Sequence, residues 1–339
     1  RFLRPFVSLL GGEREKAEAV LKKLVQDNPD SFEPHVVRGY FYNETGNIDA
    51  AIQDAQIAYQ KAPHNLRVLL LAATVISAEA KLRQEHRSFD LADIRSKLEN
   101  ALPHVAESVE DDPQFATASQ SDIEAEIEDR RQVVIDALAN LDLIAEQPEA
   151  AIARLKAAID ENPDNVGYQW SLANILIGKN QLDRAQELLD GIDDDDFPLA
   201  QKLYLQARIL AARGDWREAI EVTKRISGDS SLQRMFPATV ELLRAECEAQ
   251  LGHTREELYA YQRAVDANPN SGSARIGLAA AWAKVGRLDE ALRVLSVMES
   301  SPQVPLLMAE FEIARNLQLP PNARDWTETQ RLLDLAAAR

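Results

Sequence analysis

The sequence of 339 residues has little of what marks a disulfide scaffold or a membrane protein. Cys247 is the single cysteine, so an internal disulfide is excluded, and the composition fits a reducing compartment. No apolar run reaches the length of about 18 residues that a membrane-spanning helix needs. We therefore expect no direct membrane insertion and favour a cytoplasmic location.

The first ten residues, RFLRPFVSLL, are basic and apolar but shorter than a full signal peptide. We interpret them as the remainder of a first helix. Because the sequence begins with Arg1, a signal or anchor upstream stays open.

The motifs of catalysis and metal binding are also missing. None of the five histidines belongs to an HExxH motif or pairs with another histidine at the spacing of metal ligands. Glycine-rich phosphate loops and the GxSxG turn are absent. Cys247 lies within an expected helix and is interpreted as a small buried residue, not a nucleophile. We therefore predict that this chain is no enzyme and has no catalytic residue, cofactor or metal.

Four aspartates follow one another at residues 193–196. Tandem carboxylates can hold a calcium ion, but this run lacks the alternate ligands, central glycine and distant glutamate of an EF-hand. We interpret the run as a solvated acidic loop.

The charge balance is strongly acidic, with 38 basic and 55 acidic residues and a net charge of −17. Such a surface repels the phosphate backbone of nucleic acids and anionic lipid headgroups. We therefore expect no nucleic-acid partner. A basic peptide or protein segment would instead be steered toward the chain.

Helix-forming residues dominate what is present. Glycine is scarce at 13 residues, and alternating runs rich in Val, Ile and Thr are absent. Ala, Leu, Glu, Gln, Arg and Lys are the strongest helix formers. The composition predicts an all-α protein.

Small residues and prolines recur with a step of 34 residues, which indicates an internal repeat. The step joins Gly12 to Gly46, Ala17 to Ala51, Pro29 to Pro63, Ala151 to Ala185 to Ala219, and Gly252 to Gly286.

This pattern resembles the tetratricopeptide repeat, in which each unit of 34 residues is a hairpin of a helix A and a helix B. In that family, small residues lie near positions 8, 20 and 27, a glycine ends helix A near position 15, and a proline follows helix B near position 32. The hairpin at 32–65 carries Gly39, Gly46, Ala51, Ala58 and Pro63 at those places. Further hairpins match at 132–165, 166–199, 200–233, 238–271 and 272–303.

The resemblance implies a right-handed superhelical solenoid of antiparallel helix hairpins, roughly eight to nine in number. Small residues allow helix axes to approach to about 8–10 Å, glycine supplies a left-handed C-cap, and proline cannot continue helix B. We expect N-terminal hairpins at 1–65, an irregular extended hairpin at 66–131, a regular array at 132–303, and capping helices at 304–339.

The irregular region is marked by two steps of 50 residues, from Pro63 to Pro113 and from Pro113 to Pro163. The sequence favours lengthened helices and a long loop here, with an additional polar, acidic helical piece in SDIEAEIEDRRQ. A docking platform or a dimer contact is the alternative.

The resemblance also implies that positions 2, 5, 9 and 12 of each helix A face a concave groove. In the four hairpins from residue 132 to 271, positions 5 and 9 are occupied by the candidate groove residues Asp136, Asn140, Trp170, Asn174, Tyr204, Arg208, Leu242 and Glu246. Trp170 and Tyr204 offer rigid apolar surfaces, the asparagines offer donors and acceptors for an extended peptide, and Arg208 can hold a carboxylate. Alternatively, Trp170 and Tyr204 pack between adjacent helices A.

We therefore predict a protein-protein interaction scaffold that binds a partner peptide or protein in its groove. Binding of chaperone C-terminal tails is not expected, because the lysines of the family's carboxylate clamp are missing. One alternative is a regulatory or substrate-recruiting region of a larger enzyme. Another is a self-associating repeat protein that forms a homodimer through residues 66–131 or the C-terminal cap.

Overall fold

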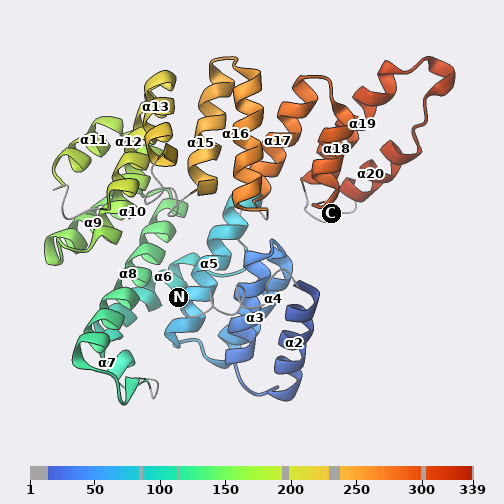
Figure 1. The fold of residues 1–339 in the computed structure, drawn as a ribbon. Coiled ribbons are helices and arrows are strands. Elements are labelled where there is room, and N and C mark those ends of the chain that lie inside the picture. The colour runs from blue at the N-terminus through green and yellow to red at the C-terminus, as the bar shows by residue number, and fades with distance from the viewer. Residues whose placement is uncertain are drawn as a thin grey trace. The chain divides into compact units, whose positions relative to one another are not determined.

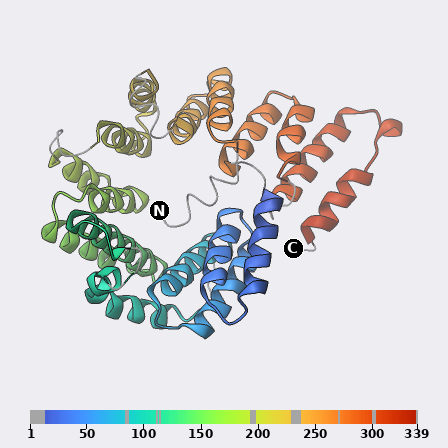
Figure 2. The same cartoon turned by 60° about the horizontal axis from the view of Figure 1, so that its bottom comes forward.

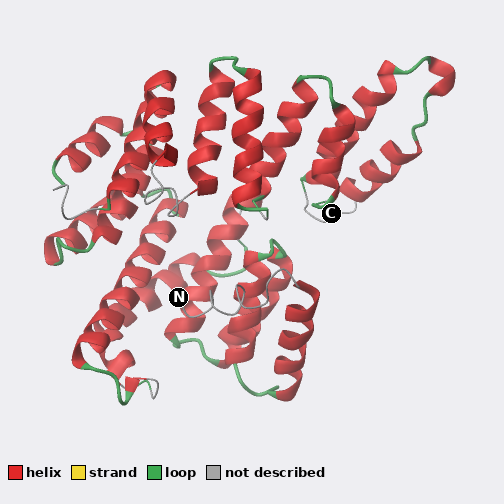
Figure 3. Ribbon diagram, viewed as in Figure 1, coloured by secondary structure: helices red, strands yellow, loops and turns green. Residues whose placement is uncertain are grey.

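The computed structural model describes residues 14–83, 87–110, 112, 115–192, 198–228, 237–269, 271–298 and 303–337. All regular structure in these ranges is helical (Figure 3). The chain divides into two compact units, Arg1–Ile175 and Leu176–Arg339. The aspartate run at 193–196 and His86 lie outside the described residues.

The first unit is a succession of antiparallel helices (Figure 1). The helices from α2 to α9 pack in succession, with η1 between α6 and α7. The helices α3, α5 and α8 also contact one another in that order, as the first helices of successive hairpins. The elements are α2 (Arg14–Asp27), α3 (Glu33–Glu44), α4 (Ile48–Lys61), α5 (Leu66–Arg83), α6 (Leu91–Ala101), η1 (Leu102–His104), α7 (Val105–Glu110), α8 (Gln120–Ile144), α9 (Pro148–Glu161) and the first part of α10 (Val166–Gly178).

The second unit repeats this arrangement, and α15 to α19 stand side by side in both ribbon views (Figures 1 and 2). Each helix from α11 to α20 packs against its successor. The elements are α11 (Leu182–Asp190), α12 (Leu199–Arg213), α13 (Trp216–Gly228), α15 (Pro237–Gln250), α16 (Thr254–Ala267), α17 (Gly272–Lys284), α18 (Leu288–Ser296), α19 (Val304–Gln318), η3 (Pro321–Ala323) and α20 (Thr327–Ala337).

The small residues of the repeat lie at the helix contacts, as predicted. Ala51, Ala151, Ala185 and Ala219 are each completely buried. Because helices cross closely at these positions, larger side chains would overpack the contact, at about 1–3 kcal/mol each. The prolines also lie as predicted, two residues after the ends of α2, α4, α9 and α16.

The turns after α3, α8, α10, α12, α15 and α17 each contain a left-handed residue. Gly214 ends α12 with φ of 89°, and Gly46 follows α3 with φ of 78°. Two hairpins have no glycine at this place, and Glu146 and Asn180 take it with φ of 59° and 57°. The left-handed conformation is therefore adopted even where the residue carries a Cβ and is less suited to it than glycine.

The irregular region consists of lengthened helices. The second helix of its hairpin continues from α6 through η1, at Pro103, into α7. The segment SDIEAEIEDRRQ is not a separate helical piece, because it forms the first turns of α8. The expected boundary between residues 131 and 132 therefore lies inside one continuous helix.

Two side chains hold this region together. The buried carboxylate of Glu79 accepts hydrogen bonds from the backbone N–H groups of Arg87 and Ser88, at 3.2 and 3.1 Å, and so fixes the loop after α5. Arg130 of α8 donates to the Ser108 carbonyl and to the Asp112 carboxylate, at 3.1 and 2.9 Å. The extension of α8 is therefore bound to α7 and the loop that follows it.

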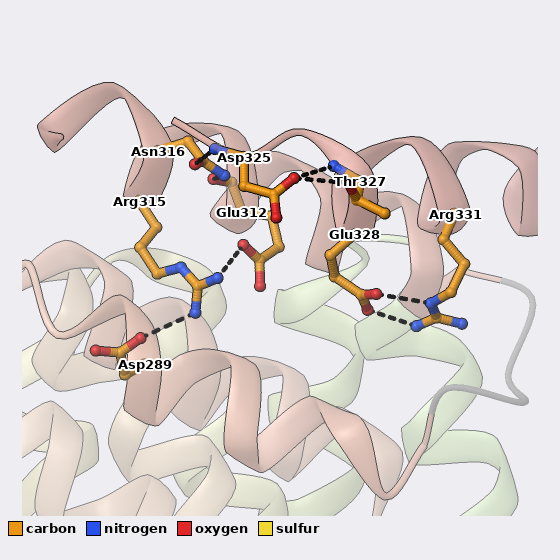
Figure 4. A network of polar contacts seen from close by, with 8 residues as sticks. All are labelled: Asp289, Glu312, Arg315, Asn316, Asp325, Thr327, Glu328 and Arg331. Atoms are coloured by element: carbon orange, nitrogen blue, oxygen red, sulfur yellow. Dashed lines mark hydrogen bonds and ion pairs between the residues drawn. The ribbon is translucent and has the colours of Figure 1, made fainter. Parts of the chain in front are cut away.

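The C-terminal hairpin is joined to α18 by a polar network (Figure 4). Arg315 of α19 lies 3.2 Å from Asp289 of α18 and 2.7 Å from Glu312. The Asn316 side chain accepts from the Asp325 backbone N–H at 3.0 Å, and the Asp325 carboxylate in turn accepts from the first residue of α20. The Pro-Pro break is therefore fixed on both sides.

A second network, in the first unit, connects three helices through Asp142 of α8. Its completely buried carboxylate lies 3.0 Å from Nη2 of Arg95 on α6 and 3.0 Å from Nε of Arg154 on α9. The Glu99 carboxylate lies 2.8 Å from the Arg154 guanidinium, so two carboxylates compensate the charges of the two arginines. This clamp joins the irregular hairpin to the next one.

Replacing Asp142 by Asn should lower the free energy of unfolding by about 2–3 kcal/mol. The value lies below the roughly 3–5 kcal/mol of a fully buried pair because both arginines keep some exposure. Urea unfolding of the variant tests this. Glu161→Gln is the matched control, since its pair with Arg131 is exposed and should contribute less than about 1 kcal/mol. Equal losses in the two variants would contradict the assignment.

Replacing Glu146 by Gly should raise the free energy of unfolding by about 0.5–1 kcal/mol, because the left-handed turn strains a residue with a Cβ. The mirror change Gly46→Ala should lower it by about 1 kcal/mol. Thermal unfolding of both variants measures the difference. Changes of the same sign in the two variants would contradict this account of the turn.

Candidate partner-binding surfaces

The predicted groove residues of the first unit lie on α8 and α10. Asn140 is exposed, whereas Asp136, Trp170 and Asn174 are half-buried. The Asn174 amide donates to the Trp170 backbone carbonyl at 2.7 Å. One of its donors is therefore already used within its own helix. Contact of Trp170 with a partner stays a prediction.

Asp136 has neutral polar neighbours on two helices. The hydroxyl of Ser171 on α10 and the amide of Gln132, one turn earlier on α8, favour the charged form of its carboxyl group. Burial nevertheless raises the pKa of Asp136 above its usual range, and these two groups lower it only in part. Gln132 and Ser171 were not predicted, because no sequence motif marks either residue.

The predicted residues of the second unit lie on α12 and α15, and two of them meet on α12. The guanidinium of Arg208 lies 5.8 Å from the centre of the Tyr204 ring. Burial raises the pKa of Glu246 on α15, while the positive charge of Arg208 acts in the opposite direction. Burial also raises the pKa of Tyr204, again opposed by Arg208. Tyr204, Arg208 and Glu246 therefore interact electrostatically, whereas Leu242 of α15 is only half-buried.

Tyr261 of α16 belongs to this surface but was not predicted, because the repeat register points only to residues of the first helices. Its pKa is raised to about 12, chiefly by burial and further by the nearby Glu246 carboxylate. A Cβ at Gly277 of α17 would overlap the Tyr261 ring. Gly277 therefore allows the aromatic ring to lie directly against the next helix.

The described residues contain no group of three or more His, Cys, Asp or Glu side chains arranged to hold a metal ion. Within the same ranges, no helix combines the length and the apolarity that crossing a bilayer requires.

Cys247 of α15 is completely buried, as predicted from the sequence. Its thiol pKa is raised to about 11, mainly by burial and further by the carboxylates of Glu246 and Glu248. A thiol with this pKa is almost entirely protonated at neutral pH, and the thiol form is a poor nucleophile.

The thiol of Cys247 should react with Ellman's reagent at pH 8 at least about a hundredfold more slowly in the folded chain than in urea, because only the thiolate reacts. The absorbance of the released thionitrobenzoate measures both rates. The rate in the folded chain should rise with pH up to the region of pH 11. Similar rates in the folded and unfolded chain would contradict the burial of this thiol.

Comparison with known sequences assigns the repeat. Profiles described as tetratricopeptide repeat match residues 11–65, 142–209, 203–222 and 248–305, which together make up more than half of the sequence. The chain belongs to the tetratricopeptide-repeat family. An array of such repeats is a protein-interaction scaffold.

Curated relatives with a sequence match include the lipopolysaccharide assembly protein B of Escherichia coli strain K12. It is 23% identical over 261 residues, which are 77% of this chain and 60% of that protein. The same protein of strain CFT073 matches to the same extent. This chain therefore spans about three fifths of the length of these relatives.

This chain is also similar to several solved structures. A tetratricopeptide repeat protein from Parabacteroides merdae has 12% identity and a TM-score of 0.44, with 90% of this chain and 98% of that chain covered. The assembly chaperone of RpL4 has 19% identity and a TM-score of 0.46, with 76% and 97% covered.

Proposed function

We propose that this chain binds a partner protein through the exposed parts of its first helices, on α8 and α10 in one unit and on α12 and α15 in the other. The observation that carries the proposal is the combination of half-buried aromatic and charged side chains on these helices. Trp170, Tyr204 and Arg208 are of the residue types that contribute most to protein interfaces.

The side chains of the second unit favour a partner with polar and charged groups. Arg208 and Glu246 provide opposite charges within one surface, next to the rings of Tyr204 and Tyr261. Such a surface combines apolar contact area with groups that fix the orientation of a bound segment.

The names of the matched relatives suggest the process in which this scaffold acts. We infer that the chain takes part in lipopolysaccharide assembly, as part of a longer protein or alongside other components. Lipopolysaccharide content after deletion of the gene in its own organism tests this setting, and an unchanged content would contradict it.

The other functions considered from the sequence stay predictions. A role as the recruiting region of a larger enzyme depends on what flanks the chain. Homodimer formation is tested by sedimentation at several concentrations, since a monomer throughout would exclude it.

The double variant Trp170→Ala with Arg208→Ala should bind a captured partner at least about thirtyfold more weakly, because truncating one interface hot spot costs about 2 kcal/mol or more. Titration calorimetry measures the affinity, and circular dichroism verifies the fold.

The matched control is Tyr259→Ala with Arg255→Ala on α16. It removes an aromatic ring and a guanidinium that lie 5.6 Å apart, of which Tyr259 is half exposed. The control should bind like the unchanged chain. Unchanged affinity in the folded Trp170–Arg208 variant would contradict the proposed function.

A further inference from the structure

Asp136 differs from the buried acids of the described chain in having no basic partner. Each buried carboxylate there lies within ion-pair distance of an arginine, lysine or histidine, namely Asp54, Glu79, Asp142, Glu241, Glu248, Glu257 and Glu312. The neutral side chains of Ser171 and Gln132 favour its charged form, and its buried Oδ1 atom has no hydrogen-bond partner among the described residues. A negative charge is thus kept half-buried without compensation.

The environment of Asp136 is built and not incidental. Gln132 lies across the first turn of α10, at a place where a Cβ on Gly167 would overlap its amide. Because Gly167 has no side chain, Gln132 can lie there, and Gln132 together with Ser171 of α10 favours the charged form of Asp136. These two neutral groups stabilise the carboxylate without neutralising its charge.

Apolar side chains lie close in sequence to Asp136 on α8 and to Ser171 on α10. Val133 precedes Asp136 by three residues on α8, which places both on one face of the helix, and it is 50% exposed. Trp170 directly precedes Ser171 on α10 and is half-buried. The long aliphatic stems of lysine and arginine pack on apolar surface, and their cations are attracted to tryptophan rings.

We propose that Asp136 is the receptor for one lysine or arginine side chain of the partner segment, with Val133 and Trp170 contacting the stem of that side chain. This inference rests on the proposed function and specifies the partner's chemistry. The net charge of −17 favours the approach of such a basic segment.

Binding of the cation should depend on pH in a defined direction. Because burial raises the pKa of Asp136, its carboxylate takes up a proton at a higher pH than an exposed aspartate does. The site is charged above that pKa and should lose its cation as the pH falls through it. A bound lysine or arginine should in turn lower the pKa of Asp136.

The test uses capped nonapeptides of serine and alanine that carry a single central Arg, Lys, Gln or Glu, titrated into the full chain at low salt. The readouts are calorimetry and the carbon resonance of the Asp136 carboxylate. We expect the Arg and Lys peptides to bind at least about tenfold more tightly than the Gln peptide and to shift the Asp136 resonance. In Asp136→Asn this preference should disappear.

The matched control is Glu124→Gln, which removes the same charge from an exposed position of α8. It should keep the preference for basic peptides. Equal response to the Arg and Gln peptides, or no response to any of them, would overturn the proposal. A response to spermidine as strong as that to the Arg peptide would also overturn it, since the site would then recognise small cations.

The two proposals can fail separately. If a captured partner binds Asp136→Asn as tightly as the unchanged chain but is lost from the Trp170–Arg208 variant, only the assignment of Asp136 fails. If the double variant also retains the partner, the proposed function fails, whatever the peptides show.

Discussion

The close approach of helices at alanine positions is the constraint on which the rest of the structure depends. One hairpin cannot bury its own apolar face, so neighbouring hairpins must stack on it. Stacking at short distance requires residues such as Ala51 and Ala219 at the crossing, where a larger side chain would force the helices apart. Apolar side chains therefore pack between successive hairpins. Polar side chains lie along the exposed parts of the first helices.

Buried ion pairs supplement this packing where the small-residue pattern is interrupted. In the hairpin of α15 and α16, position 20 is occupied by Glu257 and not by a small residue, and Lys284 of α17 lies 2.9 Å from its carboxylate. Asp142 performs a comparable role where the irregular hairpin meets the regular ones. Such pairs specify which helices meet, because a buried carboxylate without its partner is strongly unfavourable.

The sequence was sufficient to predict features that depend on local chemistry. Gly214 and Gly46 mark left-handed turns, and the prolines mark helix ends, because few other residues suit those places. Glu146 and Asn180 adopt the same turn with no local signal, since the surrounding hairpin imposes it. The continuity of α8 was also missed, because polar residues between 120 and 131 suit a loop-flanked piece and a long helix equally well.

The candidate surfaces were predictable only as positions on helices. The register identified Asp136 and Glu246, but their surroundings come from other helices. Ser171 of α10 favours the charged form of Asp136, and the Glu246 carboxylate contributes to the raised pKa of Tyr261 on α16. Contacts of this kind between distant residues leave no periodic trace in a single sequence.

The most direct test of the account is hydroxyl-radical footprinting of side chains with and without a captured partner. The account predicts that Trp170 and Tyr204 become protected while Tyr259 on α16 stays equally reactive. Protection of Tyr259 with unchanged reactivity of Trp170 and Tyr204 would contradict the claim that the first helices of the hairpins bind the partner.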